Sequence, residues 1–187
     1  MKVLPTKLDG VYIIEPPVFE DQRGFFMETH HQSKYTEAGI EYVFVQDNLS
    51  HSLRGTLRGL HYQLHQAQAK LIQVIGGAIF DVAVDIRRGS PNFGQWTGSL
   101  LSDENKLQMY IPEGFAHGFC VLSEAADVIY KCTDFYAPDD EGGILWSDPA
   151  LAIEWPVSKP LLSAKDSQLP LLADVPPARL PVYKESK

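Results

Sequence analysis

Two side chains in this sequence of 187 residues have the right chemistry for moving protons, His61 and Tyr130. An imidazole, with a pKa of about 6.5, can accept a proton near neutral pH, whereas a phenol, with a pKa of about 10, stays protonated and can donate one. Tyr130 shares a strand face with Val128 and Cys132, which predicts that it points inward. Histidines in strands are usually structural and inward tyrosines often belong to the core, so the residue types alone leave both roles open.

A group of cations offers a site for an anionic ligand. Its members are Arg23, Arg54, Arg58 and Lys70. Arginine can form paired hydrogen bonds to phosphate oxygens, but surface arginines without a ligand are the simpler alternative. The formal net charge of −8 argues against non-specific binding to nucleic acid or to an anionic membrane, because such binding needs a basic field.

A third candidate, His117, lies in a short turn motif. Residues 112–117 read PEGFAH and fit the Pro-x-Gly-x-x-His pattern of the second cupin motif, in which a turn delivers a histidine into the mouth of a barrel. A metal-binding cupin also carries a His-x-His pair followed by Glu, because a divalent metal needs three or four converging ligands. Here residues 61–63 read HYQ, and no Glu lies between Gln63 and Ile79. We therefore predict a site without metal or cofactor, although His65 leaves a metal ligand open.

The elements that must position these side chains are predicted to be short β-strands. In residues 78–86, Phe80, Val82, Val84 and Ile86 alternate with the intervening residues, and a period of two indicates a strand. Similar runs occur at residues 70–75, 107–111, 118–122 and 127–132, separated by turns rich in Gly and Pro. This spacing predicts an all-β sandwich or barrel. One short helix is expected at about residues 33–38, with Ser33 as N-cap and Gly39 ending it.

Length and composition predict a single domain at residues 1–187, since 44% apolar residues suffice for one buried core. No apolar run approaches about 18 residues and residues 1–10 lack a secretory signal, so we expect a soluble cytoplasmic protein. Cys120 and Cys132 lack metal-ligand spacing and are predicted to be buried free thiols. The proline-rich end, residues 169–187, is expected to cover the surface or pack on a partner chain, and an extended tail at 173–187 stays open.

Seven segments, in order, are similar to the signatures of the dTDP-4-dehydrorhamnose 3,5-epimerase family. They are FEDQRGFFME at 19–28, QDN at 46–48, LRGLHYQ at 57–63, FDVAVDIR at 80–87, SPNFGQW at 90–96, IPEGFAHGF at 111–119 and ILW at 144–146. The resemblance covers about residues 3–172. It implies a cupin-like jelly-roll barrel with a few short helices, and a homodimer in which the N-terminal segment of one chain completes the nucleotide site of the other.

The resemblance also implies a substrate, dTDP-4-dehydro-6-deoxyglucose, and a product, dTDP-4-dehydro-L-rhamnose, on the way to dTDP-rhamnose for cell-surface polysaccharide. The C4 ketone makes the protons on C3 and C5 acidic. Epimerisation then needs a base on one face, an acid on the other and a cation for the enolate oxygen. His61 resembles the family's base, Tyr130 its acid, Asp166 the carboxylate that pairs with the base, and Lys70 the cation.

The remaining matches imply contacts to the nucleotide. Arg23 and Arg58 resemble ligands of the diphosphate, and Tyr136 resembles the residue that stacks on thymine. Phe135 stands where relatives commonly have a tyrosine, so it keeps the ring and loses a hydroxyl. The other implied substrate-binding residues are Phe26, Glu28, Gln46, Asp47, Asn48, His117, Glu141 and Lys165.

Three alternatives stay open. The first is a single-site epimerase that acts at C3 or C5 alone on a related keto-sugar, which the presence of both His61 and Tyr130 disfavours. The second is a metal-dependent cupin enzyme, and the third is a non-catalytic sugar-binding or structural cupin.

Overall fold

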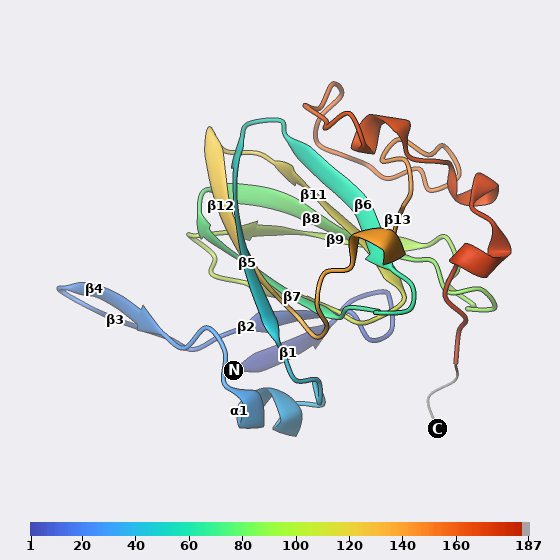
Figure 1. The fold of residues 1–187 in the computed structure, drawn as a ribbon. Coiled ribbons are helices and arrows are strands. Elements are labelled where there is room, and N and C mark those ends of the chain that lie inside the picture. Colours follow the sequence, from blue (N-terminus) through green and yellow to red (C-terminus); the bar gives the residue numbers. More distant parts are fainter. Residues whose placement is uncertain (185–187) are drawn as a thin grey trace.

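The computed structural model describes residues 1–184 and shows a protein built mainly of short β-strands (Figure 1). The strands are β1 (Lys2–Pro5), β2 (Tyr12–Glu15), β3 (Val18–Asp21), β4 (Gly24–Met27), β5 (Gln46–Leu53), β6 (Leu57–Gln63), β7 (Lys70–Gly76), β8 (Ala78–Asp85), β9 (Trp96–Ser102), β10 (Gln108–Ile111), β11 (Phe115–Val121), β12 (Ala125–Cys132) and β13 (Glu141–Gly143). The helices of this part of the chain are α1 (Gln32–Glu37) and the short 3₁₀ turns η1 (Pro138–Asp140), η2 (Asp166–Gln168), η3 (Leu172–Asp174) and η4 (Pro177–Arg179).

Two antiparallel sheets form the body of the molecule. One has the strand order β1-β2-β10-β7-β12-β5, and the other has the order β13-β6-β11-β8-β9. They pack face to face (Figure 1), so the predicted all-β, cupin-like jelly-roll fold is confirmed. Each of the five predicted strands overlaps an observed one: β7, β8, β10, β11 and β12.

The strand with the clearest sequence signal, β8, is buried on both faces. Ile79 and Ala83 belong to the apolar cluster between the two sheets, together with residues of β7, β10 and β12. Val82 and Val84 face the other way and join a second cluster on the outer side of the five-stranded sheet. The alternation in the sequence therefore separates two cores and not a core from solvent.

The C-terminal segment covers that outer side. Leu172, Val175 and Leu180 are buried in the second cluster. Further along, the Tyr183 N–H donates a hydrogen bond of 2.9 Å to the Arg88 carbonyl. Residues 173–184 are therefore not an extended tail but pack on their own chain through short 3₁₀ turns, because the segment places apolar side chains between its prolines. The last residues of the predicted tail, 185–187, lie outside the described part of the chain.

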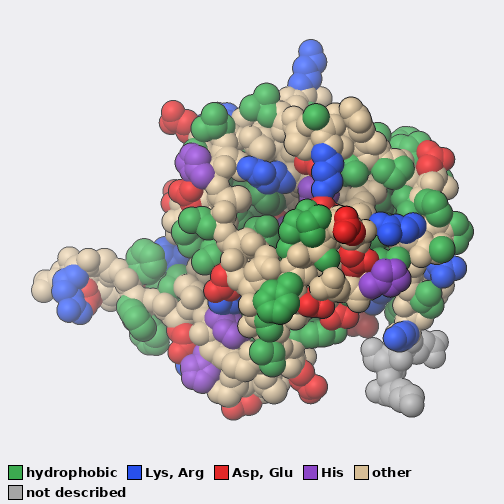
Figure 2. All heavy atoms as spheres, viewed as in Figure 1, with side chains coloured by type: hydrophobic (Ala, Val, Ile, Leu, Met, Phe, Trp, Pro, Cys, Tyr) green, Lys and Arg blue, Asp and Glu red, His purple; other side chains and the backbone are tan. Residues whose placement is uncertain are grey.

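The N-terminal part behaves differently, because β3 and β4 form a hairpin that leaves the body of the molecule (Figure 1). Figure 2 shows it as a narrow projection with charged side chains at its tip and apolar ones nearer the barrel. Phe19, Phe25 and Phe26 on this hairpin are 62%, 57% and 70% exposed. An apolar surface of this kind usually meets another surface.

The predicted helix exists, but its start was misplaced. α1 begins at Gln32 with His31 as the N-cap residue, and Ser33 lies inside the first turn with its hydroxyl 3.0 Å from the His31 Nδ1. Gly39, at a φ of 89°, follows the helix as predicted. Tyr35 anchors α1 in a third apolar cluster against the outer side of the six-stranded sheet. Among residues 1–184, no helix is long and apolar enough to span a membrane.

Candidate active site

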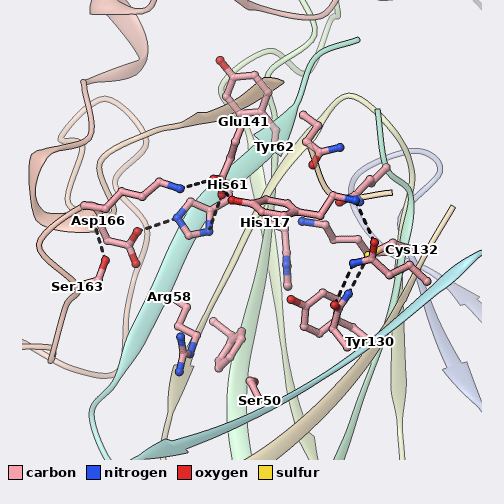
Figure 3. Close-up of a pocket in the computed structure, with 18 residues that line it drawn as sticks. Ser50, Arg58, His61, Tyr62, His117, Tyr130, Cys132, Glu141, Ser163 and Asp166 are labelled. Carbon is pink, nitrogen blue, oxygen red and sulfur yellow. Dashed lines mark hydrogen bonds and ion pairs between the residues drawn. The ribbon is translucent and has the colours of Figure 1, made fainter. Parts of the chain in front are cut away.

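A cavity of about 410 Å³ lies at the mouth of the barrel and is lined from both sheets (Figure 3). This volume suits a small organic ligand. The structure brings together most of the side chains singled out from the sequence. Those that line the cavity are His61, Tyr130, Asp166, Lys70, Gln46, Asn48, Arg58, His117, Tyr136, Glu141 and Lys165.

A histidine–aspartate pair occupies one wall. His61 comes from β6 and Asp166 from η2, and the His61 Nε2 lies 2.7 Å from an Asp166 carboxylate oxygen. Burial alone would raise the pKa of Asp166, but its hydrogen bonds and the charge of His61 outweigh burial and hold the pKa below its usual range. The ionised carboxylate therefore fixes Nε2 as the protonated nitrogen, which leaves Nδ1 free to accept a proton.

A second carboxylate, Glu141, lies near that free nitrogen. Its Oε1 is 4.0 Å from the His61 Nδ1, and its Oε2 accepts hydrogen bonds from the Tyr136 hydroxyl, at 2.9 Å, and from the Lys165 ammonium. Burial would raise the pKa of Glu141, but these two hydrogen bonds and His61 lower it below its usual range. The His61 ring thus lies between two carboxylates, Asp166 on its Nε2 side and Glu141 on its Nδ1 side.

The facing sheet supplies the opposite wall. Tyr130 on β12 and Lys70 on β7 line the cavity from strands that pair in register, with Tyr130 opposite Ile72 and Cys132 opposite Lys70. Burial raises the pKa of the Tyr130 phenol, so this side chain holds its proton firmly. Burial lowers the pKa of the Lys70 ammonium, an effect that Cys132 and two carboxylates oppose.

A second histidine–aspartate pair lies below the cavity floor. The His117 Nε2 is 2.8 Å from an Asp81 carboxylate oxygen, and Asp81 is fully buried. The other Asp81 oxygen is buried without a hydrogen-bond partner in the described structure. The pair orients the His117 ring toward the cavity.

Comparisons with known proteins agree with this geometry. A family model described as dTDP-4-dehydrorhamnose 3,5-epimerase matches residues 5–174. The chain belongs to this family. A relative of that name from Pseudomonas aeruginosa is 57% identical over 176 residues, which are 93% of this chain and 97% of the relative. Another, from Neisseria gonorrhoeae, is 53% identical over 167 residues, and the match covers 89% of this chain but only 51% of the relative.

A solved structure is also closely similar. It is the dTDP-6-deoxy-D-glucose-3,5-epimerase of Legionella pneumophila in complex with dTDP-4-keto-L-rhamnose, with a TM-score of 0.96 and 52% identity. The alignment covers 98% of this chain and 99% of that structure.

Four side chains that resembled family ligands lie outside the cavity of their own chain. Arg23 and Phe26 sit on the projecting hairpin, where Arg23 pairs with Asp21, and Glu28 pairs with Lys34 just beyond it.

The fourth is Asp47. It lies on β5 between two cavity-lining residues, and the strand's alternation turns its carboxylate to the outer face, 2.9 Å from the Lys131 ammonium. The Asp47 carboxylate therefore does not line the cavity of its own chain in the described structure, and its contact to a ligand stays a prediction.

The sequence prediction missed several residues of the epimerase cavity. Cys132, Gln63, Phe119 and Ser163 line it, as do Ser50, Tyr62 and Gln68. A strand period of two would have found Cys132, two residues after Tyr130, and Gln63, two residues after His61. Cys120 and Cys132 are buried free thiols, as predicted. Among residues 1–184, no group of three or more His, Cys, Asp or Glu side chains is arranged to hold a metal ion.

Proposed function

We propose that this chain epimerises dTDP-4-dehydro-6-deoxy-D-glucose at C3 and C5, giving dTDP-4-dehydro-L-rhamnose in dTDP-rhamnose biosynthesis. One observation carries the proposal: His61 and Tyr130 line the same cavity from facing sheets. A hexose ring seated between them presents one face to the imidazole and the other to the phenol. Removal of a proton on one face and its return on the other inverts the carbon.

His61 begins the reaction. Its Nδ1 takes the proton from C3 or C5. The electrons of the broken C–H bond form a double bond to C4, and the electrons of the C4 carbonyl double bond move to the ketone oxygen O4. The enolate oxygen is stabilised by the Lys70 ammonium on the facing wall. The imidazolium that forms is stabilised by Asp166, whose carboxylate lies 2.7 Å from Nε2.

Tyr130 completes the inversion. Its hydroxyl donates a proton to the same carbon from the opposite face as the enolate returns to the ketone, and the resulting phenolate is reprotonated from solvent. Because burial raises the pKa of Tyr130, its proton is not lost to solvent before the enolate forms. His61 releases its proton to solvent, and a second round inverts the other carbon.

The nucleotide is held by the remaining side chains of the cavity rim. Arg58 provides a cation for the diphosphate, and Tyr136 an exposed ring for the thymine. Gln46, Asn48, His117, Glu141 and Lys165 supply further polar contacts. The two buried free cysteines suit a reducing compartment, so we place the reaction in the cytoplasm.

The hairpin of β3 and β4 completes the site of a second copy in a homodimer. Its three exposed phenylalanines support this assignment, as does the position of Arg23 away from its own cavity. In the dimer, Arg23, Phe26 and Glu28 then contact the nucleotide bound by the partner.

Deuterium exchange tests the reaction. The protein is incubated with the 4-keto sugar in heavy water, and the label is located by NMR. Deuterium at both C3 and C5, with inversion, is expected. Label at one carbon alone would establish a single-site epimerase. His61→Ala should abolish deuterium exchange while leaving dTDP affinity within about twofold, and an unchanged exchange rate in this variant would refute the mechanism. Full loss of activity after metal ions are stripped from the wild type would instead indicate a metal-dependent enzyme.

Mixed dimers test the exchange of the hairpin. His61→Ala and Arg23→Ala chains are purified separately, unfolded together and refolded as a mixture. With exchange, each mixed dimer carries one intact site, so roughly a quarter of wild-type activity returns from random pairing. The two variants refolded alone are the controls. A mixture no more active than the mean of the two controls would show that the hairpin serves its own chain.

A further inference from the structure

We infer that Gln63 is a positioning residue, which holds residues 134–137 so that the Tyr136 ring stands ready at the mouth of the cavity. Gln46 on β5 and Gln68 in the loop before β7 assist it. This inference rests on the proposed function, because it takes Tyr136 as the group that stacks on the nucleotide base.

The Gln63 side chain makes three hydrogen bonds, all to backbone atoms. Its Nε2 donates to the Gln66 carbonyl at 2.6 Å and to the Phe135 carbonyl at 3.1 Å, and its Oε1 accepts from the Ala137 N–H at 2.8 Å. Two of these bonds hold the residues on either side of Tyr136. An amide is the side-chain group that can donate twice and accept at the same point, so neither Glu nor Met can replace all three bonds.

Two further glutamines bind the same stretch of backbone. The Gln46 Oε1 accepts from the Tyr136 N–H itself, at 3.0 Å, and the Gln68 Nε2 donates to the Asp134 carbonyl at 2.8 Å. All three glutamines line the cavity, yet their amides bind this segment, which leaves them less free for a ligand. Four consecutive residues, 134–137, are therefore each tied through the backbone to a glutamine that is distant in the sequence.

The segment needs such ties because it forms no helix or strand of its own. It is irregular chain between the end of β12 and the start of η1, and Phe135 and Tyr136 are 60% and 52% exposed. A free loop of this kind would lose conformational entropy on binding, and that loss would weaken affinity. The ring hydroxyl is fixed as well, since it donates to Glu141, which pairs with Gln63 across β6 and β13.

The position of Gln63 adds a second argument. It lies two residues after His61, where a metal-binding cupin places the second histidine of its metal site. Gln63 is only 7% exposed, and a buried amide without partners would cost about 1–3 kcal/mol. Its polar groups bind the loop that carries Tyr136, so a position that holds a metal ligand in other cupins here organises nucleotide binding.

The test compares Gln63→Met with the matched control Gln66→Met, whose side chain is exposed three residues away. We expect Gln63→Met to raise the Kd for dTDP, measured by calorimetry, about 5- to 10-fold and to raise KM alike while kcat changes less. Gln66→Met should change neither. A fall in kcat with unchanged Kd would overturn the positioning role.

A double-mutant cycle separates positioning from a general loss of structure. In a Tyr136→Ala background, Gln63→Met should weaken dTDP binding no more than about twofold, because the ring it positions is gone. An undiminished 5- to 10-fold loss would refute the inference. If Gln63→Met does not fold, Gln68→Met, which removes the single bond to the Asp134 carbonyl, takes its place in the cycle.

Hydrogen exchange keeps this inference distinguishable from the proposed function. In the ligand-free protein, Gln63→Met should speed amide exchange at Ala137 and Tyr136 at least tenfold, whether or not the protein turns over a sugar nucleotide. Unchanged exchange at both amides would reject the positioning role of Gln63 even if the epimerase activity is established. If the variant exchanges faster but the wild type does not bind dTDP, the proposed function is rejected and the positioning role of Gln63 is retained.

Discussion

Replacement of Asp166 by Asn removes the charge beside His61, together with the long hydrogen bond of 3.4 Å that the second carboxylate oxygen accepts from the Gly59 N–H. The amide has the shape of the carboxyl, and its oxygen can still accept the hydrogen bond from the His61 Nε2, which now spans 2.7 Å. The Asp166 side chain is only 6% exposed, so solvent screens this pair weakly. We expect the Asp166→Asn variant to fold and to bind dTDP normally, because the lost charge matters chiefly when His61 carries a proton.

The size of the effect follows from the charges. Two unit charges about 4 Å apart interact by about 4 kcal/mol at an effective dielectric constant of about 20. The neutral hydrogen bond that Asn keeps recovers about 1 kcal/mol. The imidazolium is then less stable by about 3 kcal/mol, which lowers kcat about a hundredfold.

The assay is kcat for epimerisation, with the rate of deuterium entry into the substrate as a second readout that should fall in parallel. A matched control exists on the outer surface, where Asp127 pairs with His51 at the same distance of 2.7 Å but with both side chains well exposed. Asp127→Asn should leave kcat within about twofold. An Asp166→Asn variant with kcat within about threefold of the wild type would refute the role of the pair.

Three further predictions concern the acid, the pH dependence and the backbone of the site. Tyr130→Phe should lower epimerisation by about 10²- to 10⁴-fold, yet deuterium should still enter the substrate with retained configuration, because His61 can remove a proton and return it to the same face. NMR of the recovered substrate checks this prediction. If Tyr130→Phe loses deuterium entry together with epimerisation, the assigned roles of His61 and Tyr130 are contradicted. The depressed pKa of Asp166 means that its carboxylate stabilises the fold fully above its reference value of 3.8 and less as the pH falls through the folded-state pKa. The gap in unfolding free energy between wild type and Asp166→Asn should therefore narrow below about pH 3.8 in denaturant titrations, and a gap that widens there would have the wrong sign. Gly59→Ala should destabilise the protein by about 3 kcal/mol or more, because the new Cβ would lie 2.6 Å from a backbone oxygen of β11 and because Gly59 has a φ of 116°. The control is Gly55→Ala, where no atom lies within 4 Å of the new Cβ, and it should cost about 1 kcal/mol. Thermal unfolding of both variants checks this, and equal losses would show that the close approach does not matter.

The strands that could be predicted are those whose side chains build the cores. β8 shows a clean alternation because Val82 and Val84 pack in the outer apolar cluster, whereas the alternate positions of the strand include the buried Asp81 and Asp85. β5 was missed because its inward positions, Gln46, Asn48 and Ser50, are polar and line the cavity, while Leu49 and Leu53 point outward and are 66% and 60% exposed. A strand that lines an active site thus shows an inverted pattern, which hydrophobic periodicity does not detect.

The resemblance to the family identified most of the residues that line the cavity, but it did not predict the direction and contacts of each side chain. The outward direction of Asp47 follows from strand alternation alone and could have been predicted. The position of Glu141 beside the free nitrogen of His61 could not, because it depends on how β13 pairs with β6. The use of Gln63 as a loop anchor was equally hidden, since its three partners are backbone atoms.

The long sequence separation of the histidine and its carboxylate has a consequence for biosynthesis. The two residues are 105 positions apart, and Leu172, Val175 and Leu180 complete the apolar cluster on the outer side of the five-stranded sheet. A ribosome-bound nascent chain that has exposed β6 but not η2 holds a lone imidazole in an unfinished barrel. Such a chain lacks the carboxylate that pairs with His61, so the site is complete only once residues 166–180 have left the ribosome.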